Sequence, residues 1–160
     1  MRFIKKFTVL PVLFLLAHQA SAGVPVEPAL DQNALLVSYD TKIAAEKRLV
    51  YDFWRIVLVG RRLDQAQTFL RDDYIQHNPN VPTGLQGFLD FFSHLGGPRP
   101  IPDQIPDLVS IRAEGDFVIL AFVNHLVDNN HQPYTTTSFD MFRIQDSKIA
   151  EHWDVDTMNP

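Results

Sequence analysis

Two ionisable side chains in the C-terminal part of the chain interrupt stretches that otherwise have the composition of strands. Asp140 lies within an apolar run, and His152 lies in a second run that follows Gln145-Asp146-Ser147. A carboxylate is costly to bury ionised unless it is paired, and a carboxylate beside an imidazole can fix the tautomer of that imidazole. Asp140 and His152 are therefore candidate catalytic residues for acid/base chemistry on a β-hairpin.

The register of this hairpin decides whether the two side chains meet. A three-residue turn with a bulge places Asp140 opposite His152 on one face of the sheet, and this is the register we expect. A two-residue turn at Asp146-Ser147 would place Asp140 opposite Trp153, because a one-residue slip turns a whole strand over. Under the expected register the other face carries apolar residues: Phe139, Met141, Ile149, Trp153 and Val155.

A second group of candidates lies between the helical and the strand-like halves of the chain. His77 follows Tyr74-Ile75 and precedes Asn78-Pro79, in a segment where side chains can turn inward. We expect His77 to line a pocket and to bind the oxygen of a substrate. The expected pocket also takes residues for substrate binding, which are Tyr74, Trp54, Phe88, Phe92 and Asp154.

Each of these residues also has a structural interpretation, which the sequence leaves open. Asp140 could form a buried salt bridge, and His152 a purely structural hydrogen bond. His77 could belong to a turn, and Asp154 to a solvated rim. Large aromatic residues at helical spacing usually contribute to packing.

The pattern of apolar residues changes from helical to strand-like along the chain. A long helix is predicted over 39–59, a short one over 63–69, and a third after Thr83-Gly84. Strands are predicted over 108–112, 117–126, 134–144 and 148–155. Helices followed by an antiparallel meander indicate an α+β fold, with helices packed on one face of a curved sheet.

The first 22 residues have the pattern of a secretory signal, with three basic residues, an apolar run and Ala20-Ser21-Ala22 before Gly23. We expect residues 1–22 to be a signal peptide, 23–38 a leader segment, and 39–160 one domain. The protein would be exported, either to a periplasm or outside the cell. Removal of the signal changes the formal charge from −5 to −8, because it carries three basic residues and no acidic one. This acidic chain is a poor partner for nucleic acid or for an anionic membrane.

The chain has no cysteine, which excludes disulfides, thiol nucleophiles and iron–sulfur clusters. Imidazole and carboxylate ligands from His77, His125, His152 and Asp154 could in principle suit zinc or iron. Their spacing lacks the tight pairs that are typical of metal sites. We therefore expect no metal and no other cofactor.

Two motifs resemble the SnoaL-like polyketide cyclase family, within the nuclear transport factor two-like superfamily. They are Tyr74-Ile75-Gln76-His77-Asn78-Pro79, and Lys148-Ile149-Ala150-Glu151-His152-Trp153-Asp154 together with Phe139 to Arg143. The resemblance implies a cone-shaped fold with an apolar pocket, and aldol-type chemistry without metal or organic cofactor. The chain departs from the family at Ser147, where members often have glycine, and at Ala121 and Val123, where members often have histidine.

The resemblance leaves three classes of function open. The first is an enzyme with a pocket for a carbonyl compound, which catalyses aldol-type cyclisation, isomerisation or dehydration. The second is a protein that binds a small hydrophobic ligand without changing it. The third is an interaction module in which the fold serves oligomerisation and the pocket is vestigial. A homodimer through the open face of the sheet is expected in each case, because that face would otherwise expose apolar side chains to water.

Overall fold

The computed structural model describes residues 24–155, so the expected signal peptide and its cleavage site lie outside the described residues. Six helical segments precede or interrupt the sheet: α1 Gln32–Leu36, α2 Thr41–Asp52, η1 Phe53–Val59, η2 Leu63–Gln65, α3 Ala66–Phe69 and α4 Leu85–Ser93. Five strands complete the fold: β1 Leu70–Gln76, β2 Leu108–Glu114, β3 Phe117–Val127, β4 Pro133–Gln145 and β5 Lys148–Trp153. The expected α+β architecture is confirmed.

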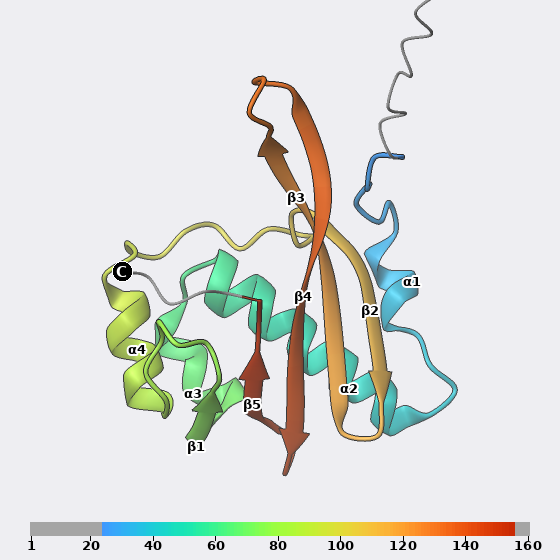
Figure 1. The fold of residues 1–160 in the computed structure, drawn as a ribbon. Coiled ribbons are helices and arrows are strands. Elements are labelled where there is room, and N and C mark those ends of the chain that lie inside the picture. Colours follow the sequence, from blue (N-terminus) through green and yellow to red (C-terminus); the bar gives the residue numbers. More distant parts are fainter. Residues whose placement is uncertain (1–23, 156–160) are drawn as a thin grey trace, which may run out of the picture.

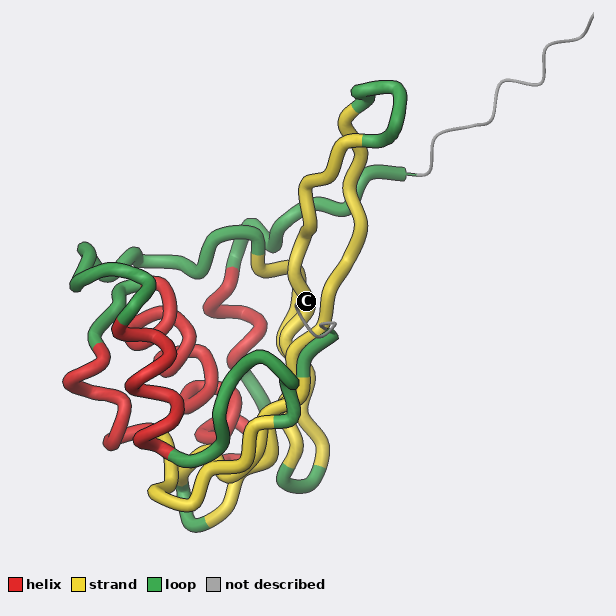
Figure 2. The backbone as a smooth tube through the Cα atoms, turned by 60° about the vertical axis from the view of Figure 1, so that its left-hand side comes forward, coloured by secondary structure: helices red, strands yellow, loops and turns green. Residues whose placement is uncertain are grey.

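The strands form a single sheet in the order β1-β5-β4-β3-β2, and the helices lie against one of its faces (Figures 1 and 2). The strands β2 to β5 are antiparallel neighbours, as the sequence predicts. In contrast, β1 pairs in parallel with β5, at the edge of the sheet. The strand β1 and the helix α1 were not predicted from the sequence.

The long predicted helix is present but changes its hydrogen-bonding pattern partway. Asp40 caps α2, where its carboxylate accepts hydrogen bonds from the backbone N–H groups of Lys42 and Ile43. After Asp52 the helix continues as the π-helix η1, which ends where the Gly60 N–H donates to the carbonyl of Arg55 at 3.0 Å. The segment thus extends to Val59, as expected.

The core lies between the helices and the inner face of the sheet, and aromatic rings dominate it. Phe53 at the start of η1 contacts Phe69, Phe88 and Phe142, with ring centroids about 6 Å apart. Trp54 stacks on Phe122 at 4.5 Å. These contacts fix the helices against β3 and β4, and they leave the end of the sheet near β1 and α4 to form the pocket described below.

The expected register of the β4–β5 hairpin is wrong. The turn has two residues, Asp146 and Ser147, both with positive φ, and Gln145 pairs with Lys148. A bulge at Ala150 then shifts the register, so that Arg143 faces Glu151 and Phe142 faces His152. Ile149 lies between the turn and the bulge, where it faces Ile144 on the inner face and is fully buried, so Ile149 does not belong to the open face.

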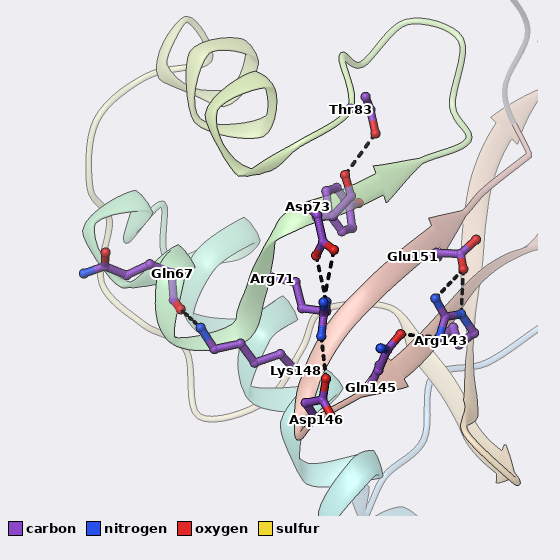
Figure 3. Close-up of polar contacts among 10 residues, drawn as sticks. Gln67, Arg71, Asp73, Thr83, Arg143, Gln145, Asp146, Lys148 and Glu151 are labelled. Atoms are coloured by element: carbon purple, nitrogen blue, oxygen red, sulfur yellow. Dashed lines mark hydrogen bonds and ion pairs between the residues drawn. The ribbon is translucent and has the colours of Figure 1, made fainter.

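Charged residues attach the edge strand β1 to this hairpin (Figure 3). Arg71 on β1 binds Asp73 at 2.7 Å and reaches Asp146 in the β4–β5 turn at 2.6 Å. Lys148 donates to the backbone carbonyl of Gln67 at 2.9 Å. These contacts hold β1 beside β5, which brings Gln76 level with His152.

Candidate functional site

The Asp140 and His152 side chains meet, although their residues are not directly opposite. Because of the bulge, Phe142 faces His152, and Asp140 lies two residues further along the same inner face of β4. Asp140 Oδ1 and His152 Nε2 are 2.9 Å apart, and both residues are more than nine-tenths buried. The imidazole also stacks on the Phe142 ring, with centroids 4.4 Å apart and planes inclined by 10°. The pair is therefore held from two directions.

Gln76 on β1 continues this contact on the other side of the imidazole. Its Nε2 lies 3.0 Å from His152 Nδ1 and also donates to the Tyr74 hydroxyl at 3.0 Å. Its Oε1 accepts from the Asn78 backbone N–H at 3.0 Å. A continuous network thus runs from Asn78 through Gln76 to Tyr74 and to the pair of His152 with Asp140.

Asp154 is the third ionisable member of the site. One atom each of Asp140, His152 and Asp154 lies within 4.8 Å of the others. Asp154 Oδ2 accepts from Asn78 Nδ2 at 2.8 Å, whereas Asp154 Oδ1 is buried and has no hydrogen-bond partner among residues 24–155. These three residues have the types that could hold a metal ion. The expectation of a metal-free protein stays a prediction.

A pocket of about 210 Å³ opens beside this cluster. Five polar residues of the network line it, namely Tyr74, Gln76, Asn78, His152 and Asp154, whereas Asp140, the partner of His152, does not. The apolar part of the wall comes mainly from η1 and α4, with Phe53, Leu58, Val81, Phe88, Phe91 and Phe92. The pocket thus combines an aromatic wall with one ionisable end, the usual composition of a small-molecule site.

Tyr74 keeps its hydroxyl proton in this environment. Burial raises the pKa of Tyr74 far above its ordinary value of 10.0, and the negative charges of Asp154 and Asp140 raise it further. The opposing hydrogen bond from Gln76 is a smaller influence on this pKa. Tyr74 can therefore act as a hydrogen-bond donor in the pocket throughout the neutral pH range.

The structure places two of the predicted site residues elsewhere. His77 lies beyond the end of β1 on the outer face, where Nε2 is 3.0 Å from Glu151 Oε2 and the ring stacks on Trp153 at 4.5 Å. Its side chain is 39% exposed, so the expectation that His77 lines the pocket is wrong. Trp54 belongs to the core, stacked on Phe122, rather than to the pocket wall. The expected lining residues Tyr74, Phe88, Phe92 and Asp154 are in place.

Sequence reasoning missed Gln76, because a neutral amide has no acid/base chemistry of its own. The available signal was its position two residues after Tyr74, which places both side chains on one face once β1 is recognised as a strand.

A larger hollow of about 690 Å³ lies elsewhere, between α2 and the turns at Asp116 and Asp146. Its lysine, Lys42, is already bound by Glu46 and Asp116, so we do not place the chemistry there.

Comparison with known proteins agrees with this geometry. A family model described as the SnoaL-like domain matches residues 50–152. Among curated proteins, none is significantly similar to the chain. Many solved structures are similar, and three of them illustrate the range.

A candidate polyketide cyclase from Acidithiobacillus ferrooxidans is 16% identical, with 74% of this chain and 90% of that chain covered and a TM-score of 0.53. A nuclear transport factor two-like protein of unknown function from Burkholderia pseudomallei is 11% identical, with coverages of 69% and 89% and a TM-score of 0.50. An epoxide hydrolase of M. tuberculosis is 16% identical, with coverages of 69% and 80% and a TM-score of 0.49.

At these identities the likeness to solved structures concerns the fold alone. The family match, in contrast, extends over most of the chain, from α2 to β5, and includes Tyr74, Gln76, Asp140 and His152. This chain belongs to the SnoaL-like domain family.

Proposed function

We propose that this protein is an exported small-molecule enzyme that performs acid/base chemistry on a carbonyl compound without a cofactor. The observation that carries the proposal is the gathering of Asp140, His152 and Asp154, with atoms within 4.8 Å of one another, at the ionisable end of an aromatic pocket. A few converging ionisable side chains beside an apolar cavity are typical of ligand-binding and catalytic sites. The family assignment supports a reaction of this class.

In the proposed reaction, a carboxylate of the cluster removes a proton from the carbon next to the carbonyl group. The electron pair of that C–H bond moves toward the carbonyl oxygen, which accepts a hydrogen bond from Tyr74 as negative charge develops. His152 holds Asp140 in place and separates it from Asp154. In a conjugated enolate, return of the proton at another carbon gives isomerisation. Attack of the enolate carbon on a second carbonyl gives aldol-type ring closure, and the protonated carboxyl then returns its proton to the new alkoxide.

The test is a screen of small enolisable ketones and ring precursors, followed by comparison of the wild type with Asp140→Asn and Asp154→Asn. A positioned proton transfer contributes on the order of 10²–10⁴-fold in rate, so loss of the carboxylate that accepts the proton should reduce kcat by that factor. Ligand affinity should stay within about tenfold, because the pocket wall is unchanged. Glu151→Gln, on the outer face, is the matched control and should turn over at the wild-type rate.

One observation favours a second candidate function, that of a non-catalytic binding protein. Both ring nitrogens of His152 already have partners within the protein, as expected if the network serves only to orient a ligand. A binding protein would show no turnover, and its affinity for ligand would fall in Asp140→Asn and His152→Ala. Wild-type turnover in both carboxylate variants would refute the enzyme proposal.

Export and dimerisation are also part of the proposal. The basic start, apolar run and Ala20-Ser21-Ala22 site support a mature protein that begins at Gly23. Mass measurement of the protein recovered outside the cytoplasm tests this, and retention of residues 1–22 would contradict it.

Elemental analysis of the untagged protein tests the absence of metal, and stoichiometric zinc or iron lost in His152→Ala would contradict the cofactor-free reaction.

A further inference from the structure

We infer that Gln76 is a positioning residue that fixes the direction of the hydrogen bonds at Tyr74 and His152, at the polar end of the pocket. As a result Tyr74 must donate its proton to the ligand, and the ligand must present an uncharged acceptor oxygen there. This inference rests on the proposed function only in assuming that the ligand occupies this pocket.

The direction starts at a group that can only donate. The Asn78 backbone N–H lies 3.0 Å from one end of the Gln76 amide, and this end must therefore be the acceptor Oε1. The other end is consequently the NH₂ group. Of its two protons, one points to the Tyr74 hydroxyl and the other to His152 Nδ1.

The imidazole tautomer follows from the orientation of the amide. His152 Nδ1 accepts a hydrogen bond from the NH₂ group of Gln76, so Nδ1 carries no proton and the ring proton lies on Nε2. That proton is directed at Asp140 Oδ1, 2.9 Å away, which accepts it as a carboxylate. Along this network Asn78 donates to Gln76, Gln76 to His152, and His152 to Asp140, so that each donor contacts an acceptor.

Reversing the Gln76 amide would create two conflicts at once. Its NH₂ group would face the Asn78 N–H, so that two donors would meet. Its Oε1 would face His152 Nδ1, which would then need the ring proton, and Nε2 would confront the Asp140 carboxylate as a second acceptor. The backbone N–H of Asn78 thus sets the orientation of the amide, because buried mismatches of this kind are costly, and the contact of a neutral His152 with the Asp140 carboxylate agrees with it.

This tautomer also bears on the metal question. A metal bound through His152 Nε2 would have to displace the proton that lies between His152 and Asp140. The remaining nitrogen, Nδ1, would then need a proton of its own and would oppose the NH₂ group of Gln76. The network favours a proton, rather than a metal ion, between these two side chains.

The consequence for the ligand appears at Tyr74. Its oxygen accepts from Gln76, and within residues 24–155 no acceptor lies within hydrogen-bond distance of its proton. Because the Tyr74 pKa is raised, the proton stays in place and is available to an oxygen in the pocket. The negative charges of Asp140 and Asp154 disfavour an anionic ligand. The volume of about 210 Å³ is below the roughly 300–1,000 Å³ of sites for drug-sized ligands, which points to a single-ring ketone or ether.

The first experiment needs no substrate. Long-range ¹H–¹⁵N correlations of the labelled full protein report which nitrogen of His152 carries the proton. The expected result is a proton on Nε2 and none on Nδ1. Gln76→Glu, which replaces the NH₂ donor with a carboxylate oxygen, should bring a proton to Nδ1. Gln67→Glu makes the same exchange on an exposed residue and should leave His152 unchanged.

A proton on Nδ1 in the wild type would overturn the inference, and this result does not depend on whether any variant folds. An unchanged pattern in a folded Gln76→Glu variant would overturn it as well. If no carbonyl compound binds but the His152 proton lies on Nε2 as expected, the proposed function would be refuted and the role of Gln76 would still stand.

The second experiment tests the ligand class by comparing cyclohexanone with methylenecyclohexane, which has nearly the same shape but no acceptor oxygen. We expect the wild type to bind the ketone about tenfold more tightly, as one hydrogen bond to a buried donor predicts. Tyr74→Phe should abolish this preference, while Tyr134→Phe, at an exposed position near the start of β4, should preserve it. Equal binding of both compounds by the wild type would contradict the assigned direction of the Tyr74 hydrogen bond.

Discussion

Two histidine–carboxylate pairs lie on opposite faces of the sheet at the same hairpin, and they have nearly the same length. On the inner face, His152 and Asp140 are 2.9 Å apart. On the outer face, His77 and Glu151 are 3.0 Å apart. They differ in burial, because the two histidine side chains are 9% and 39% exposed, respectively. The distance between an imidazole and a carboxylate therefore does not identify a functional pair.

The surrounding partners separate the two pairs. Within residues 24–155 the Asp140 carboxylate has only an imidazole as its partner, and that imidazole is oriented by Gln76 and Phe142 beside a pocket. Glu151 is already neutralised by Arg143, which donates to its other oxygen at 2.6 Å (Figure 3). A carboxylate that shares its charge with a guanidinium is a poor base. The inner pair lies beside the pocket through His152, whereas the outer pair connects β4, β5 and the end of β1.

The largest difference between the faces is expected in stability. His152→Ala removes the ring stacked on Phe142 and leaves the buried Asp140 carboxylate unpaired, so it should lower the free energy of unfolding by roughly 3 kcal/mol. His77→Ala breaks a partly exposed pair and should cost at most about 1 kcal/mol. Urea denaturation of both variants at neutral pH measures the difference. Equal losses would mean that burial does not distinguish the two pairs.

The second prediction concerns the apolar side chains around the outer pair. Phe117, Ile119 and Phe139 are 39%, 37% and 52% exposed on this face, beside Trp153, and we expect them to be buried in a homodimer. Phe139→Lys should weaken that dimer by at least about tenfold, since it places a charge in an apolar contact.

Sedimentation at micromolar concentration measures this effect, with Leu95→Lys as a control for an exposed apolar residue that follows α4. A wild type that is monomeric under these conditions would refute the dimer. It would also leave the outer pair solvated on an open surface.

The third prediction uses the pH dependence of the outer pair. Hydrogen bonds from His77 and Arg143 hold the pKa of Glu151 below its ordinary value of 4.5. A carboxylate with a depressed pKa in the folded state stabilises the protein above its ordinary pKa, and the contribution is lost as pH falls through the folded value. Glu151→Gln should therefore be destabilised by a few tenths to about 1 kcal/mol at pH 6, and its difference from the wild type should shrink as the pH falls through the folded pKa of Glu151. Thermal unfolding over a series of pH values from 6 downward provides the measurement, and a difference that stays constant over the whole series would exclude this ionisation as its cause.

The sequence predicted elements wherever apolar periodicity was strong. The helix that ends at Val59, the helix after Gly84 and the four antiparallel strands are all present. The strand β1 was missed because Arg71, Asp72 and Asp73 interrupt its alternation, and its pairing with β5 is a contact between distant parts of the chain.

The candidate site was predictable in part. Asp140 and His152 stand out as ionisable residues in apolar strands, and they do meet. The strand register that brings them together was not predictable, because it depends on a bulge at Ala150 that the local residue types do not indicate. His77 was misplaced because its environment is decided by Trp153 and Glu151, which are far along the chain.

The smallest expected effect lies in the turn that sets the two faces in register. Asp146 and Ser147 have φ values of 52° and 60°, a left-handed conformation that costs a residue other than glycine roughly 1 kcal/mol. Ser147→Gly should remove this strain but make the unfolded chain more flexible, for a net gain of about 0.5 kcal/mol in unfolding free energy. Asp146→Gly should gain less or even lose stability, because Asp146 also binds Arg71. Chemical denaturation of the two variants checks the order. A destabilised Ser147→Gly would indicate that the serine side chain itself supports the turn, and that the register separating the inner from the outer pair depends on more than backbone conformation.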